Sequence, residues 1–391
     1  MSRPPSTPAG SLPEPSAEER QHSAALTAVL RTAMDEAGGV IPFARFMELA
    51  LYHPGLGYYA GGRRKFGASG DFVTAPEMGH VFAHCLARQC REILKHTTGD
   101  ILEAGAGSGA LAADLLLELE RLDSLPAHYR ILELSHELRT RQTETLRTRA
   151  PHLLARVQWL DALPEPGFRG IVLGNELLDA MPVERFRMHG THVARLGVGV
   201  EDDHFERREL PADSALVKRV LAFQLADGYE SEIGLAAEGW VRSVADILEH
   251  GVLLLIDYGF PRSEFYHPDR SRGTLMCHYR HHAHPDPLRL VGLQDITAHV
   301  DFSAIAAAAR EAGLDLLGYA SQAMFLIGCG LDEVTSHLFS DDPRAHLTVT
   351  NEIKKLALPH EMGELFKVVA FSRGAVGALR GFAVQDRKAR L

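Results

Sequence analysis

Three glycines at alternate positions, Gly105, Gly107 and Gly109, separate a short apolar stretch from a segment rich in Ala and Leu. Glycine lets a strand turn sharply into a helix and lets a ligand approach the backbone closely. A helix that begins at such a turn offers unpaired N–H groups and a partial positive charge. The spacing therefore predicts a nucleotide-type binding corner. The alternative is a tight strand-to-helix turn that binds nothing.

Glu103 stands two residues before the first of these glycines, at the end of the predicted strand. A carboxylate there suits a ligand with a cationic amino acid end, and S-adenosylmethionine (SAM) carries both an ammonium and a sulfonium group. The same carboxylate would repel the pyrophosphate of NAD. Gly105, Gly107 and Ala110 nevertheless satisfy the dinucleotide fingerprint as well, so an NAD-dependent oxidoreductase stays open as the alternative.

Polar side chains also follow the next three predicted strands, at 129–134, 156–160 and 170–174. Ligands of open α/β sheets bind at the carboxyl ends of the strands, so these side chains should share one edge. An acid after the second strand can accept hydrogen bonds from ribose hydroxyls, and one after the third can accept from an adenine amino group. The candidate cofactor residues at these ends are Glu133, Ser135, Asp161, Ala162 and Asn175.

A polar segment that contains glycine, residues 70–77, precedes a predicted helix at about 78–96. In one interpretation this segment is a lid over the ligand, in which Gly70 and Thr74 contact the cofactor while Asp71 and Glu77 point inward. In the other interpretation it is a loop that begins the helix, with Thr74 as the N-cap and Glu77 completing a capping box.

The order of predicted elements indicates an α/β protein with a single binding sheet. Strands and helices alternate from residue 98, give way to a β-rich and helical insertion, and resume with a buried strand near 251–256. We expect late strands at 314–319, 322–327 and 366–372, the last of them antiparallel, and no second βαβαβ half of the kind that dehydrogenases carry. The predicted segments are a disordered tail at 1–25, a helical or lid segment at 26–97, core parts at 98–183 and 251–375, an insertion at 184–250 and a C-terminal tail at 376–391.

The chain of 391 residues has a formal net charge of −10, which argues against broad electrostatic binding to nucleic acid or anionic membrane. Its longest apolar run is too short to span a bilayer. Four cysteines without a CxxC pair fit a reducing compartment, and the first 25 residues lack an apolar signal core, so we expect a cytoplasmic location. Four histidines within 278–284 lack the spacing of a helical metal site, so we expect a polar loop and no metal.

Several stretches together resemble the MidA-type family of SAM-dependent methyltransferases, which includes the mitochondrial complex I assembly arginine methyltransferase and bacterial relatives. The resemblance implies a class I methyltransferase fold, which is a Rossmann-like seven-stranded sheet, with an N-terminal helical lid, a β-rich and helical insertion, and bound SAM. The chain departs from the family pattern in the glycine loop, where Ala104-Gly-Ala replaces the commoner Gly-Pro-Gly. The matching stretches are GDFVTAPE at 70–77, LEAGAGSG at 102–109, NELLDAMPV at 175–183, IDYG at 256–259 and DITAHVDF at 295–302.

The resemblance further implies methyl transfer to an arginine guanidinium of a protein substrate. A guanidinium must be oriented and must lose a proton, and carboxylates can do both. Glu176 is the best candidate, with Asp179 and Asp71 as partners, while Asn175 could position the acceptor through its amide. The competing interpretations are a helix N-terminal acid at Glu176 and a non-catalytic assembly factor that only binds SAM. The insertion offers a surface for a partner protein or for a second subunit in a homodimer.

Overall fold

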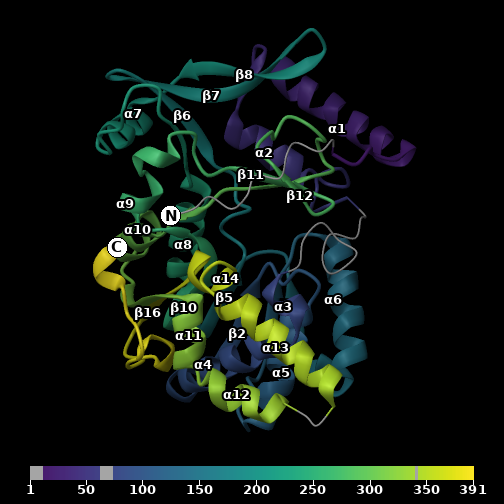
Figure 1. Ribbon diagram of the computed structural model, residues 1–391, viewed down its shortest axis with the longest axis vertical. Helices are drawn as coiled ribbons and strands as arrows, with labels where there is room; N and C mark the ends of the chain where they lie inside the picture. Colours follow the sequence, from purple (N-terminus) through teal and green to yellow (C-terminus); the bar gives the residue numbers. More distant parts are fainter. Residues whose placement is uncertain (1–11, 62–73, 340–341) are drawn as a thin grey trace.

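A computed structural model describes residues 12–61, 74–339 and 342–391, and its lower half in Figure 1 is built around one mixed sheet. The strands run in the order β15-β16-β10-β5-β2-β3-β4, with β14 paired to the end of β10. Neighbours from β10 to β4 are parallel, whereas β16 lies antiparallel between β10 and β15. The strands are β2 (Asp100–Ala104), β3 (Tyr129–Leu132), β4 (Val157–Leu160), β5 (Phe168–Asn175), β10 (Leu248–Phe260), β14 (Val300–Asp301), β15 (Asp315–Ser321) and β16 (Phe366–Arg373).

Alternate residues of the central strands enter two separate apolar cores, one on each face of the sheet. Ile101 packs in the core that includes α4 and α5, while its neighbour Leu102 packs in the core that includes α8 and α10. This two-sided burial explains why the parallel strands are continuous apolar runs. The helices on the first face are α4 (Val81–Thr97), α5 (Ala110–Arg121), α6 (His136–Arg149), α11 (Gln322–Gly328), α12 (Leu331–Leu338) and α13 (Pro343–Ala357), and those on the second are α8 (Leu235–Ile247) and α10 (Phe302–Glu311).

The N-terminal segment and the insertion form a second unit above the carboxyl ends of the core strands (Figure 1). Strand β1 pairs antiparallel with β7 of the insertion, so Ile41 lies opposite Val198, and both side chains are buried in one apolar cluster. The two segments therefore share a sheet and a core. The elements are α1 (Ala17–Glu36), β1 (Val40–Pro42), α2 (Phe43–Tyr52), β6 (Glu184–His189), β7 (His192–Glu201), β8 (His204–Pro211), α7 (Ser214–Leu221) and β9 (Glu230–Ile233).

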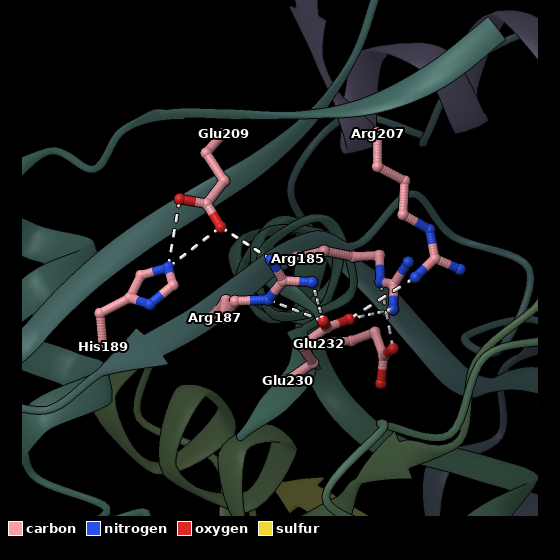
Figure 2. A network of polar contacts seen from close by, with 7 residues as sticks. All are labelled: Arg185, Arg187, His189, Arg207, Glu209, Glu230 and Glu232. Carbon is pink, nitrogen blue, oxygen red and sulfur yellow. Dashed lines mark hydrogen bonds and ion pairs between the residues drawn. The ribbon is translucent and has the colours of Figure 1, made fainter. Parts of the chain in front are cut away.

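A network of Arg and Glu side chains crosses this second sheet, as Figure 2 shows. Arg187 on β6 donates from Nε to Glu230 Oε1 on β9 over 2.7 Å and from Nη1 to Glu209 Oε1 on β8 over 2.9 Å. Its neighbour Arg185 is buried, with Nε 3.4 Å from Glu232 Oε1. The network therefore ties three strands of the insertion together.

The structure corrects three expectations about local structure. Helix α1 begins at Ala17, inside the predicted disordered tail of 1–25, because Ser16 and Glu19 form a capping box and Leu26 and Leu30 are buried. The predicted strand at 322–327 is helix α11, with apolar side chains packed on the core at helical spacing. The predicted polar loop at 278–284 contains parts of a three-stranded sheet, composed of β11 (Met276–Tyr279), β12 (His282–His284) and β13 (Asp295–Thr297).

The remaining short elements connect these layers. They are α3 (Ala75–Met78), α9 (Arg262–Phe265), α14 (Met362–Leu365) and 3-10 turns at Pro151–Arg156, Pro268–Arg270, Arg380–Phe382 and Lys388–Arg390. Helix α8 falls within the predicted insertion of 184–250, yet it packs on the core sheet. In the parts of the chain that the structure describes, no helix is long and apolar enough to cross a membrane, and no group of three or more His, Cys, Asp or Glu side chains could hold a metal ion.

Candidate active site

A cavity of about 1360 Å³ lies between the carboxyl ends of the core strands and the second unit. One side, which we call the glycine half, is formed by residues 103–108 after β2 together with residues at the ends of β3 and β4. The other side, which we call the acidic half, contains Tyr52, Tyr59, Asn175, Glu176, Asp179, Tyr258 and Asp295. The cavity therefore brings together most of the residues that the sequence singled out.

The turn after β2 depends on glycine, because Gly105, Gly107 and Gly109 all have a positive φ. Gly105 has φ +70° and Gly109, the N-cap of α5, has φ +82°, which are left-handed conformations that other residues rarely adopt. A Cβ atom on Gly109 would lie 3.0 Å from the Cα atom of Gln142, and one on Gly105 would lie 3.0 Å from Leu177 Cδ1. Gly105 and Gly107 line the cavity, whereas Gly109 lies behind it and holds α5 against α6.

Glu103 is buried at the end of β2 and lines the glycine half. Burial raises the pKa of its carboxyl to about 7, the charge of Glu133 adds to the increase, and the Tyr129 hydroxyl opposes it. That hydroxyl donates to Glu103 Oε2 over 2.8 Å. A cationic ligand beside Glu103 would recover the cost of ionising the buried acid, which is the role expected for the ammonium of SAM.

Two other predicted cofactor residues lie at the end of β3. Glu133 accepts from the Ser135 N–H over 2.8 Å and from Gln142 Nε2 over 3.1 Å. Burial raises the pKa of the Glu133 carboxyl despite these hydrogen bonds. Ser135 is the N-cap of α6, where its hydroxyl accepts from the Leu138 N–H. Both residues line the cavity, so their placement suits the ribose contact that we predicted.

Asp161 and Ala162 after β4 also line the cavity, but the Asp161 carboxylate already has a partner. Its Oδ1 atom accepts from Arg139 Nη2 over 2.7 Å, and the Asp161 side chain is 90% exposed. The adenine contact proposed for Asp161 stays a prediction.

The segment that follows β5 carries the acids of the acidic half in an unusual backbone conformation. Glu176 has φ +50°, and the next three N–H groups, those of Leu177, Leu178 and Asp179, all point at Asp257 Oδ2 with distances of 3.2, 2.9 and 3.3 Å. Asp257 is buried at the end of β10. One carboxylate therefore holds the turn that presents Glu176 and Asp179 to the cavity.

The protonation of these two acids is set by burial. Burial, followed by the charge of Asp179, raises the pKa of Glu176 to about 8, although Asn175 Nδ2 donates to Glu176 Oε1 over 3.3 Å. Burial raises the pKa of Asp179 to about 6, and the increase is smaller because the Tyr258 hydroxyl donates to Asp179 Oδ2. The pair therefore favours a cationic ligand, which would stabilise both carboxylates and restore the charge of Glu176 at neutral pH.

The segment at 70–77 is only partly described. Gly70 and Asp71 lie outside the described residues, whereas Thr74 and Glu77 line the cavity. The predicted capping box is absent at α3, because the Thr74 side chain makes no cap hydrogen bond. Glu77 instead accepts from the Ser108 hydroxyl in the glycine turn. This contact joins the segment to the cofactor corner.

Sequence reasoning missed an aromatic and acidic wall that faces Glu176. Tyr52 and Tyr59 stack with ring centroids 5.5 Å apart, and the Tyr59 hydroxyl donates to Asp295 Oδ1 over 2.9 Å. Tyr52 donates to the Ala180 carbonyl over 2.9 Å. Burial raises the pKa of Tyr59, so its hydroxyl stays protonated, whereas Tyr52 is 40% exposed. The only local signal is the His53-Pro-Gly turn, which brings the end of α2 back to Tyr58-Tyr59.

The arrangement defines the class of the protein as a class I SAM-dependent methyltransferase. The sheet is parallel except for one antiparallel strand, β16, which lies between β10 and the edge strand β15. A family model described as an S-adenosyl-L-methionine-dependent methyltransferase matches residues 85–320. The chain belongs to this family, the MidA-type methyltransferases, and the predicted family, fold class and cofactor are confirmed.

Solved structures and curated proteins agree with this membership. The chain is 48% identical to a structure from Burkholderia thailandensis described as a methyl transferase bound to S-adenosyl-homocysteine, with a TM-score of 0.95, covering 97% of this chain and 100% of that one. It is 26% identical to Protein arginine methyltransferase NDUFAF7, mitochondrial, of Danio rerio over 85% of this chain and 83% of the relative. The human protein of the same name is also 26% identical, over 85% of this chain and 80% of the relative.

The prediction of a cytoplasmic location is wrong by this comparison. The curated relatives from Danio rerio, Drosophila melanogaster, Rattus norvegicus and Homo sapiens all carry the designation mitochondrial in their names. That prediction relied on missing signals in a short N-terminal stretch and on cysteine usage, and neither feature distinguishes reducing compartments from one another.

Proposed function

We propose that this methyltransferase acts on an arginine guanidinium of a protein substrate. The observation that carries the proposal is the acid pair of Glu176, which is half-buried, and Asp179, which is buried, on the same cavity as the glycine turn. A guanidinium stays protonated in proteins and presents five N–H donors, so a buried pair of carboxylates is its natural partner. The names of the curated relatives, which are protein arginine methyltransferases, support the same substrate class.

The size of the cavity supports two reactants rather than one. A pocket for one drug-sized ligand has about 300–1,000 Å³, whereas this cavity has about 1360 Å³. The glycine half fits the cofactor through Glu103 and the backbone turn, and the acidic half is left for the acceptor. The stacked Tyr52 and Tyr59 would form the wall beside the acceptor, where aromatic faces attract a cation.

Bound SAM supplies an activated methyl group on its sulfonium. Transfer of that methyl to a guanidinium nitrogen requires the nitrogen to release a proton, because the product is still a monocation. Glu176 is proposed to accept the proton, since its raised pKa makes its ionised form a stronger base than an exposed carboxylate. Asp179 and the amide oxygen of Asn175 are proposed to orient the remaining N–H groups. Such alignment can contribute up to ~7–11 kcal/mol to the barrier reduction.

The remaining predicted cofactor contacts are proposals of the same kind. Glu133 and Ser135 would meet the ribose, Ala162 and Asp161 would lie beside the adenine, and Glu77 would close the corner from the opposite side through its contact with Ser108. Each can be tested by its effect on the dissociation constant for S-adenosyl-homocysteine.

The test is methyl transfer from radiolabelled SAM to proteins of a cell lysate, followed by acid hydrolysis and identification of the labelled amino acid. We expect label in methylarginine with the wild-type protein, and Glu176→Gln should lower the rate about 100-fold or more while the SAM dissociation constant stays within threefold. Glu144→Gln, at an exposed helix position, is the matched control. Label in another amino acid would refute the arginine proposal. Equal rates for Glu176→Gln and wild type would remove Glu176 from the reaction.

The two alternatives make different predictions. An NAD-dependent oxidoreductase would carry a second parallel βαβαβ half, whereas the chain after β5 enters the antiparallel strands β6 to β9. A non-catalytic assembly factor would bind SAM without transferring label to any protein, and the same radiolabel experiment separates it from an enzyme.

A further inference from the structure

Tyr258 is the residue of the acidic half that lies on the core strand β10, and the proposed mechanism gives it no role. It follows Asp257 at the end of β10, and its backbone N–H donates to Asp257 Oδ1 over 2.9 Å. Its side chain lines the cavity, and its hydroxyl donates to Asp179 Oδ2. Asp257 thus holds the backbone of residues 177–179, and Tyr258 holds the side chain of Asp179.

The Tyr258 ring has little freedom to rotate away from Asp179. His299 packs edge-on against it with ring centroids 5.0 Å apart, and Phe366 does so with centroids 5.4 Å apart. Burial raises the pKa of Tyr258, and Thr297 opposes that rise as a side-chain partner of the hydroxyl, while the Thr297 hydroxyl donates to the Met276 carbonyl over 3.5 Å. The backbone adds a further link, because the Ala298 N–H donates to the Asp179 carbonyl over 3.0 Å.

The two oxygens of the Asp179 carboxylate consequently differ. Oδ2 accepts from Tyr258, whereas Oδ1 is buried and makes no hydrogen bond of good geometry with any residue in the described ranges. A buried carboxylate oxygen in that condition is costly, so the donation from Tyr258 to Oδ2 is the main side-chain contact that stabilises the charged carboxylate. Within the described ranges, the Glu176 side chain accepts from Asn175 and from the backbone at Ala75 but from no tyrosine.

We propose that Tyr258 is a positioning residue, which fixes the Asp179 carboxylate through Oδ2 and so holds the acid pair of the acceptor subsite in place. The part of this proposal that concerns the acceptor rests on the proposed arginine substrate. The part that concerns the contact between Tyr258 and Asp179 does not. The hydroxyl of Tyr258 also keeps Asp179 ionised at neutral pH, because it stabilises the charged form of the carboxylate. Tyr258 and Asp257 would then act together as the support that makes the acceptor subsite rigid.

The test is Tyr258→Phe, which removes the hydroxyl and keeps the packed ring. We expect kcat/KM for the protein acceptor to fall about 10- to 100-fold, and the acidic limb of its pH profile to move up by about one to two pH units. The dissociation constant for S-adenosyl-homocysteine should stay within threefold. A merely structural role would lower activity equally at every pH and weaken cofactor binding. Tyr319→Phe is the matched control, because the Tyr319 hydroxyl is buried, has no hydrogen-bond partner among the described residues, and lies away from the cavity.

A second measurement separates this inference from the arginine proposal. Carboxyl-¹³C labelling of aspartate, with Asp179→Asn used for assignment, gives the pKa of Asp179 without any acceptor. An upward shift in Tyr258→Phe supports the positioning role even if the acceptor is not arginine, and an unchanged Asp179 pKa overturns it even if arginine is methylated. If Tyr258→Phe does not fold, Thr297→Val removes a group that lowers the pKa of Tyr258, which makes the hydroxyl a weaker donor, and should produce a smaller shift in the same direction; no shift in that variant would also overturn the role.

Discussion

The glycine half of the cavity comes from short consecutive stretches at the ends of neighbouring strands, whereas the acidic half gathers side chains from four separate parts of the chain. Residues 103–110 alone supply the buried Glu103, the turn and the start of α5. The acidic half needs α2 and the turn after it, the segment after β5, the end of β10, and β13. The glycine half is therefore mainly a backbone structure, and the acidic half is mainly a side-chain assembly.

The two halves also manage buried charge differently. Glu103 and Glu133 each have their own donors, Tyr129 for Glu103 and Ser135 with Gln142 for Glu133, and the charge of Glu133 is a smaller cause of the Glu103 pKa than burial. In the acidic half the charge of Asp179 is the second cause after burial of the raised Glu176 pKa, and the turn that carries both acids depends on supports from β10. Changes to the backbone should thus damage the glycine half most, and changes to single polar atoms should damage the acidic half most.

The largest effect is expected from a backbone change in the glycine half. Gly109→Val would place a β-branched residue at φ +82° with its Cβ 3.0 Å from Gln142 Cα. Gln142 would have to move, although its amide holds both the Gly107 carbonyl and Glu133. We expect the dissociation constant for S-adenosyl-homocysteine, measured by calorimetry, to rise about 100-fold or more.

Gly239→Val provides the control for this change, because Gly239 lies in α8 and nothing stands within 4 Å of an added Cβ. It carries the same change in side chain without the left-handed backbone or the contact with α6. A Gly109→Val protein that binds cofactor within fivefold of wild type would contradict the view that the glycine half is set by its backbone.

The same contrast explains how much of the fold and of the candidate site can be predicted from the sequence alone. The glycine turn and the acids at the strand ends can be located because each is encoded within a few residues, and the cavity contains Glu103, Glu133 and Glu176 as predicted. Tyr59 and Asp295 could not be paired, because 236 positions separate them and their contact exists only once β13 and the turn after α2 are packed together. The pairing of β1 with β7 could not be predicted for the same reason, because the two strands are far apart in the sequence.

Predictions from local sequence patterns were wrong where tertiary contacts determined the structure instead. The stretch that forms α11 is a short apolar run that follows a strand, so it suggested a second strand, yet Phe325 and Leu326 are buried by packing as a helix. Glu77 fits a capping box in sequence but bonds Ser108, a residue 31 positions away. The start of α1 was missed because the surrounding Pro, Ser and Glu residues suggested disorder, although Ser16 and Glu19 carry the capping signal.

A smaller effect is expected from the titration of Glu103 in the glycine half. Its pKa of about 7 in the free protein means that the carboxyl is largely protonated below neutral pH, whereas the cationic cofactor selects the ionised form. Affinity for SAM should therefore be full above pH 8 and fall as pH drops through about 7, approaching tenfold per pH unit. Calorimetric titrations between pH 6 and 8.5 measure this dependence.

Glu103→Gln should bind SAM more weakly at high pH and lose most of that pH dependence. Glu176→Gln is the comparison from the acidic half, and it should keep the pH dependence of SAM binding because Glu103 is intact. If the two variants behaved alike, the two halves would be electrostatically coupled, and the division drawn between them would have to be abandoned.

The smallest effect concerns the stability of the helices behind the glycine half. His80 Nδ1 lies 3.0 Å from Asp114 Oδ2, and the hydrogen bond to Asp114 raises the pKa of His80. A raised pKa in the folded state gives stability that is present below the unfolded pKa of about 6.5 and is lost as pH rises through the folded value. Because the His80 side chain is 58% exposed, the contribution should be only about 0.5 kcal/mol.

His84, one turn later on α4, offers a matched control of opposite sign, because burial lowers the pKa of His84. A lowered pKa makes the folded state bind the proton less well, so His84 costs stability at acid pH and ceases to do so as pH rises above about 6.5. Urea unfolding at pH 5.5 and 8 should therefore show that His80→Gln loses stability mainly at pH 5.5, while His84→Gln gains it there. Equal effects of His80→Gln at both pH values would mean that the Asp114 contact adds nothing to the support of α5 and the glycine turn.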